Sequence, residues 1–510
     1  MLKNIFITIL LICSVSGVWG QKSVKVKVSG NVITTDGVPA EFINIQLKNT
    51  FYGGTSDGKG YFEFMAPAGQ YTMIVQSIAA HRREFPVTIE EGKENHFADI
   101  EIRENINQLE QVVVTGQFSP QSMRNSLYKV RTVNSEQIRQ KAPTSVQSLL
   151  NTEIGIRLSN DMALGETDFE LMGMSGNNVK ILLDGIPLID RGATKQSLSQ
   201  LDVNSIERVE IVEGPMSVVY GTDALAGVIN IITKKGDGYS EENTWRVGAR
   251  VQEESMGKEY DFFKDKGLHN ESIDLGFNHK SGLFVNGGYT RNNHGGWQGD
   301  LTGREKRWHP KDQALMNGMF GFQNRNMNVW YRLDFLDEKI FGPNNGSELQ
   351  PEKVSDKDFL TKRYTHQLQS DWKLDNRLDV HAALSYQDYK RRTRTTESDL
   401  STGEKWLSSA EASQDITQYK AWIARATVAW NIAPEFSVQP GVEYQWTQGE
   451  GGRIDGTPKV SDLAFFLSAE YKPWEWLSLR PGVRTFIVAD YDAPIAIPSV
   501  LTKFKLTKHM

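Results

Sequence analysis

Long stretches of alternation between apolar and polar residues begin at about Thr244 and continue toward the end of the chain. In two clear examples, Trp422 to Trp430 and Phe436 to Trp446, aromatic residues stand near the ends of the apolar face. A strand with one apolar face and one polar, charged face is typical of membrane-spanning β-barrels. Soluble sandwiches also alternate, but their strands rarely exceed about ten residues. The alternation therefore favours a membrane barrel over a soluble all-β fold.

Short and long connectors take turns along this region, as expected when short periplasmic turns alternate with long outer loops. Short turns are predicted near 279–282, 324–326, 375–377, 433–434 and 473–475, and longer polar segments at 293–311, 339–361, 392–414 and 448–460. The region 244–510 would hold about twelve strands, whereas barrels with a plugged lumen use about 22.

The chain is therefore expected to be a C-terminally truncated part of a longer barrel protein. Its last six residues, 505–510, lack the terminal aromatic residue that such barrels usually carry. An incomplete barrel leaves two unpaired edges, which hydrocarbon does not tolerate. The alternative is a complete smaller barrel of about twelve strands, whose lumen would barely hold the domain that precedes it.

The N-terminus reads as a secretory signal peptide covering residues 1–20. Lys3 supplies the positive charge, Ile5 to Val18 form the apolar run, and Gly20 is small enough to precede a cleavage site. Ile12 before Cys13 argues against a lipoprotein signal. Since Cys13 is the one cysteine, the mature chain would have no disulfide or cysteine metal site.

The composition argues against several classes of protein. The net charge is −6 with mixed signs, so nothing indicates nucleic-acid binding. No stretch after the signal peptide is apolar enough for a membrane-spanning helix. Aromatic residues make up 10% of the chain, which fits a barrel, although composition alone would favour a soluble all-β protein. No cofactor or metal site is predicted.

Residues 22–103 show short alternating runs separated by Gly turns, which predicts a small β-sandwich. The segment resembles the carboxypeptidase-regulatory-like domain. The resemblance is carried by Gly30-Asn31-Val32, Asp36-Gly37-Val38-Pro39, the run from Thr55 to Phe62, and Gly69-Gln70-Tyr71. Clustered His and Glu with zinc spacing are absent from this sequence. The resemblance therefore implies an accessory periplasmic module and not an enzyme.

A linker at 104–128 contains one apolar, β-branched run. Glu110, Gln111, Val112, Val113, Val114 and Thr115 would form an extended, weakly held strand. Such a segment can pair its free backbone groups with the edge of a partner's sheet. By itself it is equally consistent with an ordinary strand end.

Residues 129–235 predict a mixed α+β domain. Thr144 is expected to cap a short helix, with Gln147 completing a capping box and Val146, Leu149 and Leu150 as the buried face. Strands are expected over 179–183, 206–212 and 228–233, with turns at Asp184-Gly185 and Gly214-Pro215 and a Gly-rich bend from Tyr220-Gly221 to Gly227.

The runs from Ile181 to Leu188, Ile206 to Pro215 and Val219 to Thr233 resemble the plug domain of TonB-dependent receptors. The signature positions carried over from that family are Asp184, Gly185, Arg208, Glu210, Gly214, Pro215, Tyr220, Gly221 and Gly227. By the same resemblance, Glu110 to Thr115 becomes the TonB box. The family often has Arg-Gly where this chain has Met172-Gly173, so Arg208 and Glu210 are the remaining candidates for plug-to-barrel contacts.

The resemblance implies a mainly β fold, with a signal peptide, a β-sandwich, an α+β plug and an incomplete antiparallel transmembrane barrel in the outer membrane. It also implies active import of an iron-siderophore, cobalamin or haem, with TonB and outer-membrane lipid as partners. Outward plug loops would carry the ligand-contact candidates Asp161, Glu166, Asp190, Arg191 and Lys195. Alternatives are a ligand-sensing or surface-binding protein without transport, or a glycan importer. Enzyme activity is not expected, because the sequence has no nucleophile–base set, HExxH pattern or phosphate loop.

Overall fold

The computed structural model describes most of the chain in two compact units, 1–112 and 113–510. The described residues are 25–34, 39–77, 80–102, 112–116, 121–122, 126–161, 166–189, 195–221, 223–236, 242–433, 435–451, 454–474, 476–489 and 495–504. The predicted signal peptide, 1–20, lies outside them. Each unit is described by itself.

The first unit is the predicted β-sandwich. Its strands are β1 (Lys25–Thr34), β2 (Asn44–Leu47), β3 (Gly53–Thr55), β4 (Tyr61–Pro67), β5 (Gly69–Ser77), β6 (Ala80–Ile89) and β7 (Asn95–Ile102). One sheet has the order β4-β1-β7 and the other β3-β2-β5-β6. Val28, Ile45, Phe62 and Val75, which come from both sheets, are at most 1% exposed and form its core.

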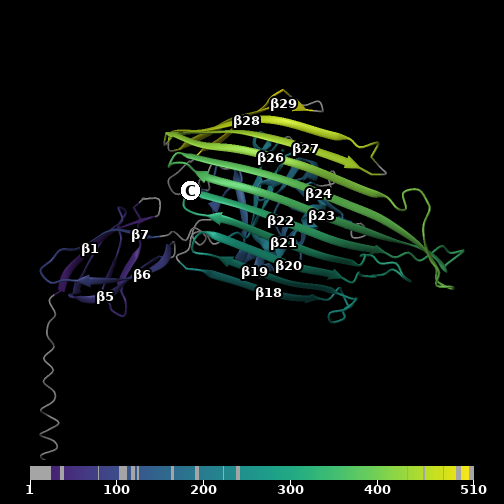
Figure 1. Cartoon of the computed structure of the whole chain (residues 1–510), viewed down its shortest axis with the longest axis horizontal. Coiled ribbons are helices and arrows are strands. Elements are labelled where there is room, and N and C mark those ends of the chain that lie inside the picture. The colour runs from purple at the N-terminus through teal and green to yellow at the C-terminus, as the bar shows by residue number, and fades with distance from the viewer. Residues whose placement is uncertain are drawn as a thin grey trace, which may run out of the picture. The chain divides into compact units, whose positions relative to one another are not determined.

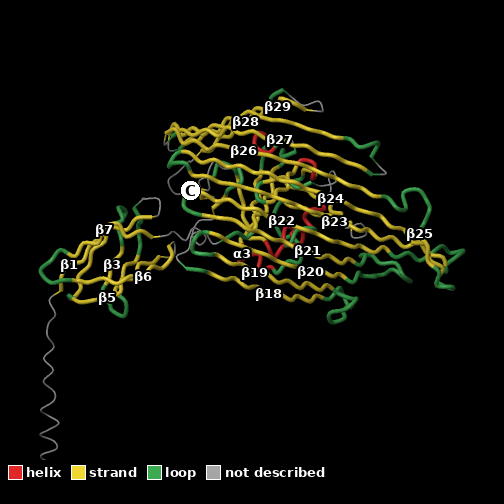
Figure 2. Tube along the Cα trace, in the orientation of Figure 1, coloured by secondary structure: helices red, strands yellow, loops and turns green. Residues whose placement is uncertain are grey.

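Strand β8 (Val112–Val113) spans the boundary between the units, and the second unit continues with β9 (Gln121–Ser122) and the plug. The plug contains β10 (Lys129–Asn134), α3 (Ser135–Lys141), α4 (Val146–Leu150), β11 (Ile156–Asp161), β12 (Glu166–Leu171), β13 (Met174–Ser175), η1 (Gly176–Asn178), β14 (Val179–Leu183), β15 (Ile186–Pro187), η2 (Gln196–Ser199), η3 (Val203–Ser205), β16 (Ile206–Glu213), α5 (Ser217–Tyr220) and β17 (Gly227–Thr233). Its helices, red in Figure 2, are short. The central sheet has the order β10-β16-β17-β14-β15.

The plug sheet is buried on both faces, because α3, α4 and η2 cover one face and the other faces Tyr128, Met216 and Val219. All seven residues of β17 are buried, which explains why the strand is apolar except for Asn230 and the terminal Thr233. The helix predicted after Thr144 exists as α4, and Val146, Leu149 and Leu150 are its buried residues.

The predicted cap of α4 was wrong by one position. Ser145, not Thr144, is the N-cap, and the capping box is completed by Ser148 and not by Gln147. Both pairs have the three-residue spacing that a capping box requires. The choice follows from which residue adopts the extended backbone conformation at the helix start, and Ser145 does so with φ −152° and ψ 162°.

The remaining strands form one antiparallel sheet of 13 strands (Figure 1). They are β18 (Thr244–Glu254), β19 (Leu268–Asn278), β20 (Leu283–His294), β21 (Lys311–Gln323), β22 (Met327–Gly342), β23 (Lys353–Lys373), β24 (Leu378–Asp399), β25 (Lys405–Leu407), β26 (Ile416–Ala433), β27 (Phe436–Glu450), β28 (Lys459–Trp474), β29 (Leu477–Ala489) and β30 (Ile497–Phe504). Twelve pair in sequence order and β25 adds to β24. Among the described strands, β18 and β30 are the two ends of an open sheet.

All five predicted short turns join consecutive strands, but the long connectors are shorter than predicted. Strands β22 and β23 extend into the segment 339–361 and leave 343–352 as the connector. Strand β24 has 22 residues, which corresponds to about 70 Å and exceeds the roughly 30 Å of bilayer hydrocarbon. A strand that extends past the hydrocarbon would have water on both faces, where alternation is no longer required although backbone pairing can continue.

Burial on this sheet is the inverse of a soluble protein. On β23, Tyr364 and Leu368 are 40% and 46% exposed, whereas Thr365 and Gln367 are 2% and 0% exposed. The polar face therefore lies against the plug, and the apolar face points away from it, as in a lipid-facing barrel wall.

Within the described part of the chain, no helix has both the length and the apolar character needed to cross a membrane.

Candidate functional site

The end of the predicted TonB box is held by one buried carboxylate. Glu210 on β16 is fully buried and accepts hydrogen bonds from the backbone amides of Val114, at 3.1 Å, and Thr115, at 2.8 Å. It also accepts one from the Thr115 hydroxyl at 2.5 Å. The guanidinium of Arg208 donates to the same carboxylate at 3.0 Å. We call this arrangement the Glu210 clasp. Its donors balance the charge that burial would otherwise disfavour.

Two further contacts fix this segment. The Asn230 amide on β17 donates to the Thr115 hydroxyl at 2.9 Å. Next along the chain, Gly116 has φ +69°, and its carbonyl accepts from Arg480 on β29 at 2.6 Å. The segment therefore touches both the plug sheet and the barrel wall.

The predicted TonB box is only partly visible. Glu110 and Gln111 lie outside the described residues. Val112 and Val113 form β8, which pairs with β9 in a two-stranded sheet. Val114 and Thr115 follow at the clasp. The part that the structure describes is thus a short strand whose C-terminal end is fastened to the plug.

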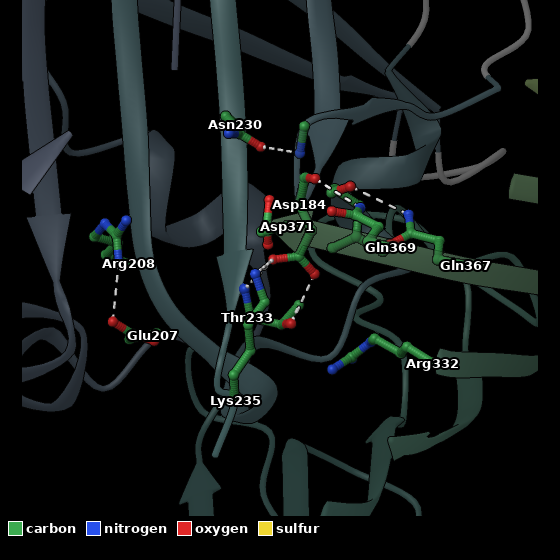
Figure 3. A network of polar contacts seen from close by, with 12 residues as sticks. Asp184, Glu207, Arg208, Asn230, Thr233, Lys235, Arg332, Gln367, Gln369 and Asp371 are labelled. Carbon is green, nitrogen blue, oxygen red and sulfur yellow. Dashed lines mark hydrogen bonds and ion pairs between the residues drawn. The ribbon is translucent and has the colours of Figure 1, made fainter. Parts of the chain in front are cut away.

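The Asp184-Gly185 turn joins β14 to β15. Both residues have positive φ, +50° and +85°, as a tight two-residue hairpin requires, and glycine accepts this without strain. The Asp184 carboxylate is buried and accepts hydrogen bonds from the amide and hydroxyl of Thr233 at 3.0 Å and 2.7 Å. Lys235 lies 3.3 Å from it. Figure 3 shows this turn fastened to the end of β17.

The charge of Asp184 is stabilised despite its burial. Burial alone would raise the pKa of Asp184, but the charges of Lys235 and Arg332, together with the Thr233 hydrogen bonds, lower that pKa below its ordinary value of 3.8. The carboxylate is therefore ionised at neutral pH and can hold the end of β17.

Two barrel glutamines seat this turn from the other side. Gln367 on β23 donates to the Leu183 carbonyl at 3.1 Å, and Gln369 donates to the Asp184 carbonyl at 2.9 Å (Figure 3). On β24, Gln387 donates to the Pro187 carbonyl at 2.7 Å. Neutral amides on the lumen face of the wall therefore bind the backbone of the plug.

A second part of the wall contacts the plug through Arg425, which belongs to a buried ion cluster of the wall. Arg425 on β26 donates to the Val219 carbonyl at the end of α5 at 2.9 Å and to Glu443 at 2.7 Å. Arg484 on β29 donates to Glu443 at 2.7 Å. All three charged groups are at most 8% exposed. The Arg425 guanidinium lies 5.0 Å from the Tyr220 ring centre, a distance typical of a cation–π contact.

The sequence did not reveal these wall contacts. The polar strand faces carry Arg425, Glu443 and Gln367. The alternation of apolar and polar residues is the same for a residue that faces the lumen and for one that lies above the membrane, so it does not tell the two apart. Arg208, a candidate plug-to-barrel residue, pairs with Glu207 and Glu210 within the plug. Glu210 contacts the linker segment and not the wall in the described interactions.

A cavity of about 340 Å³ lies between these groups. Val114 and Gly116, the Asp184-Gly185 turn, Asn230 and Lys235 line it from the plug side, and Gln369, Asp371, His381, Arg425 and Thr427 line it from the wall. The volume corresponds to about ten water molecules. The fastened linker segment thus borders open space inside the lumen.

The other signature residues shape the bends around this site. Gly214 and Gly221 have positive φ, +101° and +88°, and Pro215 follows the first of them. Tyr220 is buried beside Arg425. At Gly227 a side chain is excluded, because a Cβ atom would lie 2.1 Å from the Val212 carbonyl oxygen.

The structure describes the predicted ligand-contact residues only in part. Asp161 and Glu166 face each other across the β11–β12 pair, and their side chains are not described. Asp190 and Arg191 lie outside the described residues. Lys195 precedes η2 and is 9% exposed. Within the described residues, no group of three or more His, Cys, Asp or Glu could hold a metal ion.

Two family models match the chain. Residues 122–228 match the TonB-dependent Receptor Plug Domain, and residues 28–114 match the CarboxypepD_reg-like domain. Both agree with the resemblances drawn from the sequence.

The chain is similar to the vitamin B12 transporter BtuB of Vibrio vulnificus, with 32% identity over 139 residues. That match covers 27% of this chain and 23% of the transporter, so most of the relative's length lies outside the match.

Solved structures agree in fold. The ferric yersiniabactin uptake receptor FyuA of Yersinia pestis has 15% identity and a TM-score of 0.50, covering 74% of this chain and 70% of that one. A mutant of the ferric enterobactin receptor PfeA of Pseudomonas aeruginosa has 16% identity and a TM-score of 0.57, covering 78% and 62%.

An antiparallel wall with inverted burial and a plug seated on its polar face are the features of a plugged, membrane-spanning β-barrel, of which this chain shows an open sheet of 13 described strands. Residues 122–228 of this chain are a plug domain of the TonB-dependent receptor type, and a CarboxypepD_reg-like domain at 28–114 precedes it. Both domains and the transporter that the chain resembles agree with the predicted family, with the predicted outer-membrane location and with the prediction that the chain is not an enzyme.

Proposed function

We propose that this protein imports a scarce nutrient, an iron-siderophore, cobalamin or haem, across the outer membrane by TonB-dependent transport. The single observation that carries the proposal is the Glu210 clasp, which fastens the end of the predicted TonB box, at Val114 and Thr115, to the plug. A pull on this segment is thereby applied directly to β16, in the domain that fills the lumen.

The relatives support the class of ligand. Their names refer to vitamin B12, ferric yersiniabactin and ferric enterobactin. The proposal assigns TonB as the periplasmic partner, which pairs with the strand Glu110 to Thr115 by β-augmentation. Ligand would bind at the outward plug loops that carry Asp161, Glu166, Asp190, Arg191 and Lys195.

The proposal keeps the domain division predicted from the sequence. Residues 1–20 form the signal peptide, and residues 22–103 form the accessory sandwich. The linker with the TonB box covers 104–128, the plug covers 129–235, and the partial barrel covers 244–510. The exposed apolar face of the wall, with residues such as Leu368 and Trp422, supports outer-membrane lipid as its surroundings.

Uptake measured in a host that lacks its own receptors for the tested ligand would test the proposal. Labelled ferric siderophore, cobalamin and haem are supplied one at a time, with and without host TonB. We expect uptake of one of them only when TonB is present. Val113→Pro should abolish that uptake by removing a backbone donor from β8, whereas the matched variant Val113→Ile should retain it.

Other outcomes would contradict the proposal. Binding of a ligand at the cell surface without uptake would favour a sensing or surface-binding protein. Uptake of an oligosaccharide, with none of the three nutrients, would favour a glycan importer.

A further inference from the structure

Asn230 lies between the fastened linker segment and the turn that the barrel wall holds. Its amide nitrogen donates to the Thr115 hydroxyl, and its amide oxygen accepts from the Gly185 backbone amide, both at 2.9 Å. Glu210 is its direct cross-strand neighbour on β16. One side chain thus contacts both Thr115 of the clasp and the Asp184-Gly185 turn, and Figure 3 shows the contact with the turn.

The orientation of this amide is fixed by its partners. The Thr115 hydroxyl gives its proton to Glu210 and can only accept from Asn230. The backbone amide of Gly185 can only donate. A flipped amide would lose both bonds, and Asn230 is 1% exposed, so water would not replace them. Asparagine supplies one donor and one acceptor here, which neither an ionised aspartate nor leucine does.

The turn end of this connection is anchored outside the plug. Gln369 binds the Asp184 carbonyl from β23 and Gln367 binds the preceding carbonyl. A continuous chain of hydrogen bonds therefore runs from Gln369 through the turn and Asn230 to Thr115. Its two ends lie on the barrel wall and on the predicted TonB box.

The surroundings leave room for this chain to open. The cavity of about 340 Å³ is lined by Asn230, Gly185 and Val114 together. The charged and titratable groups that face this region are Glu207, Glu210 and Arg208 on β16, Asp184 and Lys235 beside the turn, Tyr220 on α5, and Asp371, His381 and Arg425 on the wall. If the turn moved away from Gln367 and Gln369, the Asn230 amide oxygen would lose the hydrogen bond that it accepts from Gly185. Movement of Asn230 would then break the hydrogen bond that it donates to Thr115.

We propose that Asn230 is a positioning residue that couples the seating of the Asp184-Gly185 turn on the barrel wall to retention of the TonB box at Glu210. Displacement of the turn from Gln369 loosens Thr115, so a change between plug and wall is transmitted to the periplasmic linker. This inference rests on the proposed function for its biological meaning, but the coupling itself can be measured without ligand, TonB or transport.

The test is a double-mutant cycle with a nitroxide spin label attached at Val113→Cys in a Cys13→Ser background, which leaves one cysteine in the full chain. The full chain is studied in outer-membrane vesicles, and the mobile fraction of the label reports release of the segment. Gln369→Met should raise the ratio of mobile to immobile label about fivefold, as expected for loss of a typical hydrogen bond. The same substitution in an Asn230→Leu background should add little.

A second pair avoids the plug core. Thr115→Val removes the hydroxyl at nearly constant shape, and Thr115→Ser keeps it, so only the first should mobilise the label. Asn204→Leu is the control for general loosening, because Asn204 contacts the wall at Thr290, 3.2 Å away, and its hydrogen bonds among the described residues do not involve Val114 or Thr115. In the Asn204→Leu variant, the spin label at position 113 should stay immobile.

Asn230→Asp gives a signature that a merely structural role would not. A protonated carboxyl can still donate to Thr115, whereas the ionised one cannot and stands beside Glu210. Because burial and the neighbouring carboxylate favour the protonated form, the label should be held at low pH and released as the pH rises. Asn230→Leu should show no such dependence.

Additive effects of Gln369→Met and Asn230→Leu would overturn the coupling. Equal mobility in Thr115→Val and Thr115→Ser would overturn it as well. If the expected results of the double-mutant cycle were obtained while uptake failed in every strain, the proposed function would be wrong. The coupling through Asn230 would remain.

Discussion

The hydroxyl of Thr115 donates a 2.5 Å hydrogen bond to the carboxylate of Glu210, although 95 positions separate the two residues. Glu210→Gln replaces one accepting oxygen by an amide and removes the charge. Loss of a charge-assisted bond costs about 1.5–3 kcal/mol, so the amides of Val114 and Thr115 should exchange hydrogen roughly 10- to 100-fold faster. Hydrogen–deuterium exchange measured by mass spectrometry on this segment checks the prediction.

Glu213→Gln is the matched control for that experiment. Glu213 lies on the same strand and pairs with Lys129 and Arg131, not with Val114 or Thr115, in the described interactions. Its substitution should leave exchange at Val114 and Thr115 unchanged. Unchanged exchange in Glu210→Gln would mean that the clasp does not restrain the segment.

Arg425 should be among the most important single residues for keeping the plug in place. Arg425→Met leaves the buried Glu443 with Arg484 as its remaining guanidinium and strips a donor from the Val219 carbonyl. Removal of one partner from a buried ion pair costs about 3–5 kcal/mol. We expect a loss of unfolding free energy of that order in detergent or lipid.

Arg291→Met provides the comparison on an exposed pair. Arg291 and Asp312 are also wall residues, but their side chains are 49% and 50% exposed. Exposed pairs contribute about 0–1 kcal/mol. Similar losses for the two variants would show that the Arg425 contact has no special weight.

Stability should depend on pH through Asp184. Its folded-state pKa is lowered, so the ionised carboxylate stabilises the fold above the ordinary value of 3.8, and this stability is lost as the pH falls through the lowered pKa. Asp184→Asn should reduce the free energy of unfolding by about 1–3 kcal/mol at pH 7. The difference between variant and parent should shrink below about pH 4. Urea titrations followed by tryptophan fluorescence, at pH 7 and below about pH 4, measure the difference in the free energy of unfolding between variant and parent. An equal difference at the two pH values would contradict the role assigned to Asp184.

The turn between β28 and β29 should lie at the membrane surface. Trp474 and Trp476 stack with ring centres 5.3 Å apart, and Phe504 lies 6.2 Å from Trp476. All three are at least 50% exposed, which suits an interfacial aromatic girdle. Lipids brominated near the headgroup should quench part of the tryptophan fluorescence, and the double variant Trp474→Phe, Trp476→Phe should lose that part. Replacement of the buried Trp330, 1% exposed, should leave the quenched part intact.

Local patterns in the sequence determined the class of each region. Alternation over runs such as Trp422 to Trp430 identified wall strands, because lipid on one side and the lumen on the other impose a period of two. The Gly-rich bends at Gly214, Gly221 and Gly227 located the plug turns, because those positions need positive φ or exclude a side chain. The cap of α4 was missed by one residue, since Thr144, Ser145 and their partners satisfy the same spacing rule.

The connections between these regions were decided only in three dimensions. A polar residue on a wall strand reads the same whether it faces water, as at an outer loop, or a plug carbonyl, as Gln369 does. Asn230 reads as an ordinary polar break in an apolar strand, and its contacts with Thr115 and Gly185 depend on how three distant segments meet. The alternation of apolar and polar residues along a strand depends only on that strand and on the surroundings of its two faces. Pairing across 45 or 115 positions, as Asn230 makes with Gly185 and Thr115, is set by the packing of the whole domain.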